Sequence, residues 1–333
     1  YTIIALVHNE DQYPKYGNVT YLSYPKSRKS YLFRLYYEYI GFKKLSKTLK
    51  PYFWLSMHDV TPNVSAERRA VYCHNSLPFY KAGIRGLFLQ RSIYLLSLFF
   101  KLIYRINIKE NDYVIVQQEW MRKAFRRLFS IENVVVAMPY TLCEADGEKE
   151  KSKSGKGKCI FFYPLTPMIH KNVEIIGDAV SILEKEGFTE FEVILTTNGT
   201  ENTYAKSLFK KYQSLKAIRF AGFLNREEMN HYYQQSDCLL FPSKVETWGL
   251  PITEAKEYAM PIIVSDLPYA KETVGKYNKV KFFDPDNAPE LAVIIKDFVN
   301  GRISYDPTQE TIYEAPFVQS WDELVRLLFV NYT

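Results

Sequence analysis

The sequence predicts an α/β fold with two doubly wound parallel sheets, each in its own domain. At 333 residues the chain is longer than one hydrophobic core usually serves, so two domains are the default. Apolar runs of strand length alternate with longer helical patterns almost throughout. A charged stretch with Gly and Ser but almost nothing to bury interrupts this alternation at residues 144–158, which predicts an exposed linker or loop.

The first block of alternation predicts an N-terminal domain over residues 1–150. Its helical patterns lie near residues 31–49, 86–106 and 119–129. Its strand-like runs read YTIIALV, NVTYLSY, YFWLSM, RAVYCHN, DYVIVQQ and NVVVAM. The chain starts at Tyr1 inside the first of these runs, and we expect a preceding segment to be missing.

The second block predicts a C-terminal domain over residues 151–310, followed by a separate segment at 311–333. The strand-like runs read KCIFFYP, FEVILTT, AIRFAGF, DCLLFPS, PIIVSD and KVKFFDP. The helical patterns lie near residues 172–186, 201–214, 226–235, 251–258, 268–274 and 288–300, and a last amphipathic pattern follows Pro316. Doubly wound sheets bind ligands at the carboxyl ends of their strands, so the loops after strands are the expected site.

The composition is that of a globular protein, with 47% hydrophobic and 24% charged residues. The net charge of +6 hides an asymmetry, because residues 1–140 hold 21 Lys and Arg against 9 Asp and Glu, and the remainder holds 22 against 28. The two halves are therefore expected to meet different partners. The four cysteines show no CxxC pairing, which favours buried thiols in a reducing compartment over metal ligands or disulfides.

The most informative stretch is FPSKVETWGLPITEAKEYAMPIIVSD, residues 241–266. Pro251 suits the first turn of a helix, so the turn before it lies between a strand's carboxyl end and a helix N-terminus. Free backbone N–H groups there make an anion site suited to phosphate, and Gly249 lets a ligand approach the backbone closely. Glu246 and Glu254 flank this turn, and each carboxylate can accept hydrogen bonds from two vicinal sugar hydroxyls. Taken alone, the two glutamates are better explained by structural roles, in which Glu254 complements the helix dipole and Glu246 is solvated.

The whole string resembles the donor-site signature of family 4 retaining glycosyltransferases with the GT-B fold. That signature is Pro-Ser after a strand, Glu, seven residues, Glu-Ala and an apolar strand; the matching residues are Glu246, Gly249, Leu250, Pro251, Glu254 and Ala255, with Glu272 further along. The resemblance implies two Rossmann-like domains that face a cleft, and a C-terminal helix that packs back towards the first domain.

The resemblance also implies roles for these residues. Glu246 would hold the transferred sugar, and Glu254 would hold the ribose of a nucleoside diphosphate sugar. The phosphates would lie against the turn formed by Thr247, Trp248, Gly249 and Leu250. In FYPLTPMIHKNVEIIGDA, Lys171 fits the lysine with which the family grips the diphosphate. The family's arginine is absent, and Tyr163, Pro164 or His170 occupies its neighbourhood.

Two further loops carry weaker matches to the nucleotide site. In TTNGTEN, Asn198 and Gly199 lie either near the nucleotide or in a simple turn. In FAGFLNREEM, Gly222 and Phe223 match a strand end that lies beside the base in the family. The Asp-x-Asp of FDPD, residues 283–286, could suggest a divalent metal, but Pro285 makes it a turn and GT-B enzymes as a class need no bound metal. No metal or other cofactor is therefore expected.

In the first half, SMHDVTP and VYCHNSLPF each place a histidine at the end of a predicted strand. A lone histidine is more often structural, whereas two at neighbouring strand ends are as compatible with a place in the cleft. His74 fits a functional histidine of the family, and His58 and Asp59 fit the acceptor side. The family's opening strand and Gly-rich loop are not seen, which agrees with the expected missing segment.

The run LFLQRSIYLLSLFFKLIYRI is too interrupted by Arg91, Lys101 and Arg105 to span a bilayer readily. On a helical wheel a narrow polar stripe is formed by Gln90, Tyr94, Ser97, Lys101 and Arg105. The helix is either buried on a wide face or interfacial, leaning on anionic lipid together with the basic runs PKSRKS, FKKLSKTLK and RKAFRR. No RNA- or DNA-binding module is evident, so nucleic acid is not an expected partner.

The sequence thus predicts a retaining glycosyltransferase of bacterial surface-polysaccharide assembly, such as lipopolysaccharide or capsule. The donor would be a nucleoside diphosphate hexose or N-acetylhexosamine, expected to be UDP-linked, and the acceptor a growing glycan or one on polyprenyl diphosphate. The expected catalytic set is Glu246, His74 and Lys171, at the cytoplasmic face of the inner membrane. The absent arginine favours an alternative, a catalytically weak nucleotide-sugar-binding protein. A nucleotide-cofactor oxidoreductase is disfavoured because no GxGxxG follows any strand.

Overall fold

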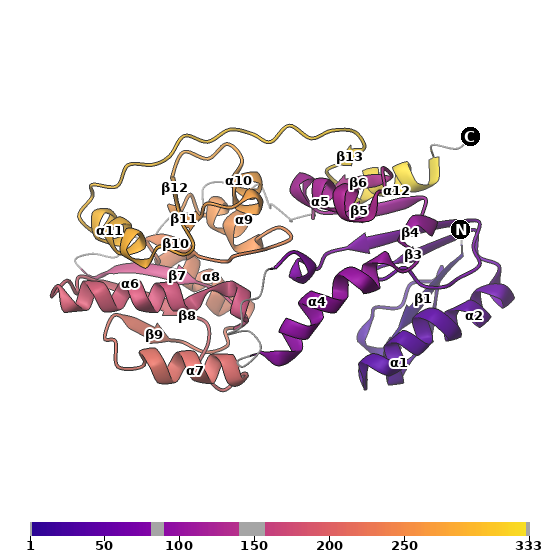
Figure 1. Ribbon diagram of the computed structural model, residues 1–333, viewed down its shortest axis with the longest axis horizontal. Helices are drawn as coiled ribbons and strands as arrows, with labels where there is room; N and C mark the ends of the chain where they lie inside the picture. The colour runs from indigo at the N-terminus through magenta and orange to yellow at the C-terminus, as the bar shows by residue number, and fades with distance from the viewer. Residues whose placement is uncertain (1, 81–89, 140–156, 331–333) are drawn as a thin grey trace.

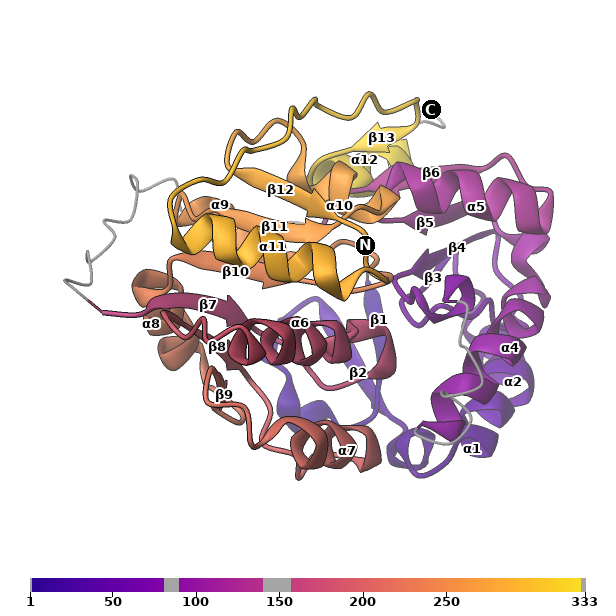
Figure 2. The same ribbon diagram turned by 60° about the vertical axis from the view of Figure 1, so that its left-hand side comes forward.

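The computed structural model describes residues 2–80, 90–139 and 157–330. Within these residues the strands form a six-stranded, a five-stranded and a two-stranded sheet, and all strand pairs are parallel. Figures 1 and 2 show two lobes side by side, one around each large sheet. The expected linker at 144–158 and Cys143 lie almost wholly outside the described residues.

The first lobe is built on the five-stranded sheet, in the order β13-β6-β5-β4-β3. Its strands are β3 (Phe53–Ser56), β4 (Arg68–Cys73), β5 (Tyr113–Val116), β6 (Val134–Ala137) and β13 (Phe317–Val318). Its α-helices are α1 (Tyr31–Tyr36), α2 (Phe42–Leu49), α4 (Arg91–Arg105) and α5 (Glu119–Phe129), with a π-helical turn (Tyr37–Gly41) between α1 and α2. The runs VVVA and YVIV are buried on both faces, as helix-covered parallel strands must be.

Two strands expected at the start of the first domain stand apart from its sheet. The strands β1 (Ile3–Val7) and β2 (Val19–Ser23) pair only with each other. Their residues are exposed or half-buried, although β1 reads IIALV and is apolar throughout. The local strand pattern was therefore right, whereas the sheet to which these strands belong could not be predicted from it.

The second lobe is built on the six-stranded sheet, in the order β12-β11-β10-β7-β8-β9. Its strands are β7 (Cys159–Tyr163), β8 (Phe191–Leu195), β9 (Ile218–Phe220), β10 (Cys238–Phe241), β11 (Ile262–Ser265) and β12 (Val280–Phe283). Its helices are α6 (Val173–Lys185), α7 (Thr203–Tyr212), α8 (Arg226–Gln235), α9 (Leu250–Glu257), α10 (Pro268–Val274) and α11 (Ala288–Val299). The chain winds outwards from β7 in one direction and from β10 in the other, so the switch point of the sheet lies between these two strands.

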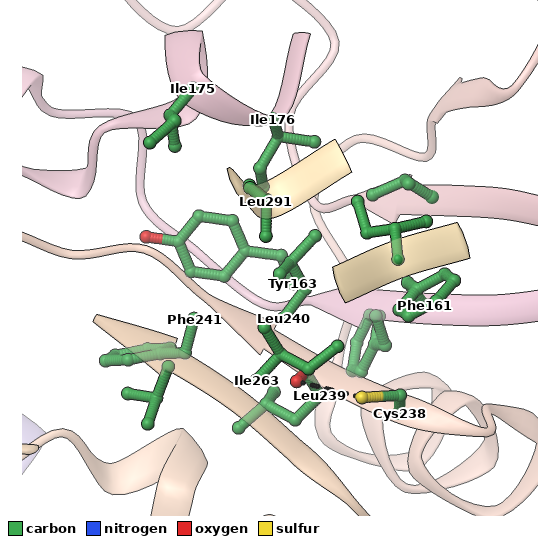
Figure 3. Close-up of a cluster of buried hydrophobic side chains, with 14 of the residues drawn as sticks. Phe161, Tyr163, Ile175, Ile176, Cys238, Leu239, Leu240, Phe241, Ile263 and Leu291 are labelled. Carbon is green, nitrogen blue, oxygen red and sulfur yellow. Dashed lines mark hydrogen bonds between the residues drawn. The ribbon is translucent and has the colours of Figure 1, made fainter. Parts of the chain in front are cut away.

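The centre of the second lobe is a buried apolar cluster beneath this switch point. Figure 3 shows Tyr163 of β7 and Phe241 of β10 close to Ile176 and Leu291, which come from α6 and α11. The rings of Tyr163 and Phe241 meet edge to face, with centroids 5.6 Å apart. The loops that leave β7 and β10 are therefore held on a fully packed base.

The C-terminal segment returns to the first lobe, as expected. After α11 the chain runs along the outside of both lobes to β13, which pairs with β6 (Figure 1). In the last helix, α12 (Trp321–Val330), Leu324 and Leu328 pack against the first sheet. The buried Arg122 of α5 donates hydrogen bonds to the carbonyls of Glu314 and Pro316 and so ties the crossing segment down. The exact domain boundaries remain predictions.

Candidate active site

The loops after β7 and β10 meet at the switch point and are bonded to one another. The backbone N–H of Lys244 donates to the carbonyl of His170 at 2.8 Å, and the Asn172 amide donates to the carbonyl of Pro242 at 3.2 Å. Beneath them the hydroxyl of Tyr163 donates to the carbonyl of Lys171 at 2.8 Å and lies 3.0 Å from the Ser243 hydroxyl. The two loops thus form one unit at the carboxyl edge of the sheet.

The structure brings together two of the three residues expected to be catalytic. The Nζ atom of Lys171 lies 2.6 Å from Oε1 of Glu246, with 18% and 13% of the side chains exposed. A pair so close and so little exposed to water gains more from its attraction than a surface pair does. Lysine and carboxylate are the groups that bind an anion and sugar hydroxyls, respectively.

His170 lies beside this pair and is 5% exposed. Burial and the positive charge of Lys171 lower the pKa of His170 to about 4, so its imidazole is neutral at physiological pH. Its Nδ1 atom has no hydrogen-bond partner among the described residues, and its ring lies 6.0 Å from that of Tyr80 in the first lobe. Tyr163 is buried and bonded below the loop, so neither residue supplies the positive charge of the absent arginine.

The turn between β10 and α9, for which the sequence predicts phosphate binding, is built around Gly249. Gly249 has a φ of 87°, a conformation that side-chain-bearing residues rarely adopt, and a Cβ there would lie 3.2 Å from Cδ1 of Ile252. Within the described residues, the N–H groups of Trp248, Gly249 and Leu250 have no acceptor, whereas that of Ile252 bonds to the Gly249 carbonyl at 2.9 Å. These free donors lie at the positive end of α9. Thr247 is half-buried at the start of the same turn.

Glu254 lies on α9, with both carboxylate oxygens bonded to α8. Its Oε1 is 2.5 Å from Nη1 of Arg226, and its Oε2 accepts a hydrogen bond from the Tyr233 hydroxyl at 2.7 Å. Arg226 is 67% exposed, so this bond can be exchanged. A carboxylate has about four lone-pair sites, and two of these remain for a ligand.

The loops after β8 and β9 differ in how far their polar groups are already used. The N–H groups of Asn198 and Gly199 both donate to the Glu201 carboxylate, at 2.9 and 3.0 Å, so this loop is a self-bonded turn. Gly222 is buried with a φ of 79°, and a Cβ there would lie 3.2 Å from the Asn198 amide. The next residue, Phe223, is 88% exposed and presents a free aromatic face at the same edge of the sheet.

In the first lobe, Asp59 and His74 form one cluster at the carboxyl ends of β3 and β4. Asp59 is 8% exposed, and its Oδ1 accepts the His74 backbone N–H at 2.7 Å and the Tyr104 hydroxyl at 3.0 Å. The His74 ring is exposed, with Nδ1 3.7 Å from that same oxygen. His58 is exposed, and its carbonyl accepts a hydrogen bond from Arg34. The geometry leaves His74 and His58 open to a ligand, whereas Asp59 lies buried and holds His74 in place.

The two lobes touch along the edge that carries these groups. The Gln90 amide donates to the carbonyl of Pro167 at 3.4 Å and accepts the N–H of Ile169 at 2.8 Å. The segment after β4 therefore reaches the loop after β7, next to Lys171. A hollow of about 470 Å³ elsewhere, lined by Lys158, Glu190 and Asp237, lies at the amino ends of the strands and is remote from this chemistry.

Two acidic features named from the sequence have structural roles. Glu272 is buried on α10, and its carboxylate accepts the backbone N–H groups of Glu119 and Trp120 at 2.5 and 3.2 Å. In the FDPD segment, Asp284 accepts the backbone N–H of Asp286 at 2.9 Å, which makes the segment a turn. Sequence reasoning missed Gln118, Thr273, Arg226 and Tyr233, because each acquires its role only from a partner distant in the chain.

The family model of the glycosyl transferases group 1 matches residues 144–315, just over half of the chain. The chain belongs to this family. The matched range contains every residue of the β7 and β10 loops described above. Sequence relatives of this group 1 glycosyltransferase include O-antigen chain mannosyltransferase B of Escherichia coli, 25% identical over 42% of the chain, and O-antigen chain mannosyltransferase RfbU of Salmonella typhimurium, 21% identical over 69%. The alignments span only 36% and 60% of those two relatives.

Among solved structures, this glycosyltransferase is similar to WaaG, a glycosyltransferase involved in lipopolysaccharide biosynthesis. The TM-score is 0.65, with 10% identity over 90% of this chain and 82% of that one. At this identity the similarity concerns the fold, and it confirms the expected GT-B architecture. The family match and these relatives confirm the resemblance to glycosyltransferases of bacterial surface-polysaccharide assembly.

Proposed function

We propose that this protein transfers a sugar, with retention, from a nucleoside diphosphate sugar to a growing surface polysaccharide. The observation that carries the proposal is the Lys171–Glu246 pair at the switch point, next to the free N–H groups of Trp248, Gly249 and Leu250. These cationic and N–H donors stabilise the charge that develops on a departing diphosphate. Glu246 accepts hydrogen bonds from the transferred sugar and so orients it.

The nucleoside lies along the same edge of the sheet in this proposal. Glu254 accepts the ribose hydroxyls through its unused lone pairs, and Phe223 stacks on the base. The departing diphosphate takes the proton of the acceptor hydroxyl on the face from which it leaves, so no protein base is required and no metal is proposed. His74 faces the acceptor from the first lobe. Uridine is the base implied by the resemblance, and the first experiment tests it against guanosine.

The experiment is a thermal-shift screen of UDP, GDP and their common sugars, followed by calorimetry and by transfer and hydrolysis assays. We expect one nucleoside diphosphate to raise the melting temperature of the protein. Glu254→Ala should weaken the binding of that nucleoside diphosphate by about 1–3 kcal/mol, and EDTA should leave transfer activity unchanged. Glu227→Ala is the matched control, since Glu227 is exposed on α8 beside Arg226.

Several results would contradict the proposal. Unchanged affinity in Glu254→Ala would remove the ribose assignment, and restoration of EDTA-treated enzyme by Mn²⁺ or Mg²⁺ would overturn metal independence. Binding without transfer or hydrolysis would favour the alternative, a nucleotide-sugar-binding protein.

We propose further that the acceptor is lipid-linked and that the first lobe binds the anionic face of a membrane. On α4 an apolar stripe faces solvent, formed by Leu95, Phe99, Leu102 and Ile106, which are 38%, 53%, 59% and 44% exposed. Their spacing of four, three and four residues places them on one side of the helix. Lys101 and Arg105 are exposed on the same helix, as an interfacial helix at an anionic surface requires.

A second exposed apolar surface supports the membrane proposal. On α1 and the turn after it, Leu32 is 79% exposed, and Tyr31, Phe33, Tyr36 and Ile40 are between 42% and 49% exposed. Basic side chains precede and follow this surface, at Arg28 and Lys29 and along α2. Figures 1 and 2 both show α1 and α4 on the same side of the first lobe. Among the described residues no helix is long and apolar enough to cross a bilayer.

Co-sedimentation with vesicles tests this surface. We expect binding to phosphatidylglycerol vesicles, weaker binding to phosphatidylcholine, and partial loss as salt rises, because the charge term is screened over about 8 Å at physiological ionic strength. The binding that remains at high salt is expected to come from apolar insertion. The variant Phe99→Ser/Leu102→Ser should therefore lose this salt-resistant part of the vesicle binding. Ile312→Ser is the control, since Ile312 is 91% exposed on the crossing segment. Equal binding to both vesicles, or equal loss in the control, would contradict the proposal.

A further inference from the structure

A buried amide from the first lobe reaches into the second lobe behind the phosphate-binding turn. Gln118 immediately precedes α5 and has no exposed surface. Its Nε2 atom donates to the Thr273 hydroxyl at 2.8 Å and lies 3.2 Å from the carbonyl of Tyr269. Both partners belong to α10, which is part of the donor lobe.

The direction of hydrogen-bond donation through this contact is fixed by chemistry. The indole N–H of Trp120 can only donate, and it bonds to Oε1 of Gln118 at 2.5 Å. The amide nitrogen of Gln118 must therefore be the atom that faces Thr273. Because the Thr273 hydroxyl accepts from that nitrogen, its own proton is free to be donated onwards. Two carbonyls lie within hydrogen-bond distance of it, that of Trp248 and that of Tyr269 one turn earlier on α10 at 3.0 Å, and the contact with Trp248 is the shorter.

The carbonyl of Trp248 belongs to the same planar peptide unit as the N–H of Gly249. Fixing the direction of the carbonyl therefore fixes the direction of that N–H, which points the opposite way. The peptide needs such a contact because glycine adopts conformations closed to other residues, as the φ of 87° at Gly249 shows. Without a partner, this peptide could therefore take up other orientations. Held by Thr273 on one side, the peptide presents its N–H on the other.

The lobes are held together at the same place by a second set of bonds. The Glu272 carboxylate accepts hydrogen bonds from the backbone N–H groups of Glu119 and Trp120. These are the first two residues of α5, so their N–H groups have no acceptor within the helix. The negative charge of Glu272 complements the positive end of α5. The same contact places Gln118, which precedes α5, opposite Thr273, which follows Glu272. Both Thr273 and Gln118 are more than nine-tenths buried, so water does not substitute for them.

We propose that Gln118 and Thr273 are positioning residues that aim the Gly249 N–H at the donor's diphosphate. The inference rests on the proposed function, in which that turn binds the phosphates. Its consequence is that donor affinity depends on a residue outside the donor lobe, and that separation of the lobes at α10 releases the turn. The phosphate site is then complete only when the first lobe is in contact with α10.

The test is calorimetry with UDP, GDP and the corresponding nucleosides. Thr273→Val keeps the shape but removes the hydroxyl, and Gln118→Met removes the amide. Each variant should lower the affinity for the nucleoside diphosphate about 10-fold and leave the affinity for the nucleoside unchanged. Thr273→Ser should keep wild-type affinity, and the double variant should be no weaker than the weaker single one. The matched control is Gln117→Met, because the Gln117 amide bonds to the Tyr72 hydroxyl at 3.0 Å within the first lobe.

The outcomes separate this inference from the function on which it rests. If wild-type protein binds no nucleoside diphosphate, the proposed function fails and the positioning role fails with it. If wild type binds while Thr273→Val and Gln118→Met bind equally well, only the positioning role is overturned. Loss of affinity in Thr273→Ser, or an equal loss in Gln117→Met, would show general damage and also overturn it. If Gln118→Met does not fold, the Val and Ser variants of Thr273 decide the question.

Discussion

The two lobes differ in where they place apolar side chains. Among the described residues, 17 large apolar side chains are exposed at or before Ile106, and only four between residues 157 and 310. Two of those four are Phe223, in the loop after β9, and Leu250, the first residue of α9, both at the proposed donor site. Half of the exposed apolar groups of the second lobe therefore lie where we propose that a small ligand binds, whereas the first lobe exposes many of its apolar groups on helices with basic neighbours.

The polar groups show the same division. At the switch point of the second lobe, carboxylates, hydroxyls and amides are bonded to one another and hold the loops in one arrangement. In the first lobe the comparable cluster is smaller, with Asp59 holding the exposed His74. A rigid site suits a donor whose reacting bond must be oriented closely. A surface with exposed rings and basic charge suits a partner that varies in shape, such as a lipid surface.

The largest expected effect comes from Glu246→Gln, which keeps the shape and removes the charge beside Lys171. Transfer should fall by about 100-fold or more, because sugar orientation and the charge balance at the leaving group both change. Nucleoside diphosphate affinity should stay within a few-fold of wild type. Glu110→Gln in the first lobe is the control and should not affect transfer. An equal loss of transfer and of nucleotide affinity would assign Glu246 to the nucleotide or to the fold.

Burial shifts the pKa of Glu38 in the first lobe and of His170 in the second, and the two shifts have opposite consequences for stability. Burial raises the pKa of Glu38 to about 7, partly offset by Arg34, so the native state keeps a proton that the unfolded state has lost. Stability from Glu38 is present below about pH 4.5 and is lost as pH rises through 7. Burial lowers the pKa of His170 to about 4, so its contribution is present above about pH 6.5 and is lost as pH falls towards 4.

Urea unfolding between pH 4 and 9 measures both effects. In Glu38→Gln the free energy of unfolding should fall less as pH rises through 7 than it does in the wild type. In His170→Gln it should fall less as pH drops towards 4. Each difference should be up to about 3 kcal/mol. A profile unchanged by either variant would mean that the group concerned reaches water in the native state.

Substitutions of glycine test the difference in packing between the lobes. A Cβ on Gly177 of α6 would lie 2.4 Å from the Tyr212 ring, whose hydroxyl is held by the Glu174 carbonyl and by Asp178. Gly177→Ala should therefore lower the free energy of unfolding by about 1–3 kcal/mol. Gly17→Ala in the β1–β2 region should change it by less than about 0.5 kcal/mol, because nothing lies within 4 Å of the added carbon. Similar values for both variants, measured by urea unfolding, would contradict the comparison.

Most of the fold was predictable because its signals are local. The segments Glu119–Phe129, Arg226–Gln235 and Pro268–Val274 begin and end where the sequence predicts. For α8 the reason is visible, since Asn225 and Glu228 form a capping box. The turn between β10 and α9 was predictable for the same reason, since strand end, glycine and helix start follow one another along the chain.

The remainder depends on contacts between distant segments. The pairing of Gln118 with Thr273 joins residues 155 apart, and no pattern near either residue indicates it. On α4 the polar stripe found on the helical wheel does not reveal which apolar residues are covered. Packing against the first sheet buries Phe100 and Tyr104 and leaves Phe99 and Leu102 in solvent. The face that a helix buries is decided by its neighbours, and only the tertiary structure supplies them.

The smallest expected effect concerns two exposed apolar side chains, one in each lobe. Phe223 is 88% exposed beside Gly222, and Leu32 is 79% exposed on α1. If Phe223 stacks on the base, Phe223→Ala should weaken nucleoside diphosphate binding by about 1 kcal/mol, the lower end of the range for stacking of one base on an aromatic ring. Leu32→Ala should leave that affinity unchanged, and neither variant should alter the melting temperature, since little packing is lost. Calorimetry with the free nucleoside sharpens the test. If the Phe223 ring stacks on the base, its loss should weaken binding of the nucleoside and of its diphosphate by the same amount. Weakening of the diphosphate alone would place Phe223 near the phosphates, and an equal effect of Leu32→Ala would remove the distinction between a ligand-facing and a membrane-facing lobe.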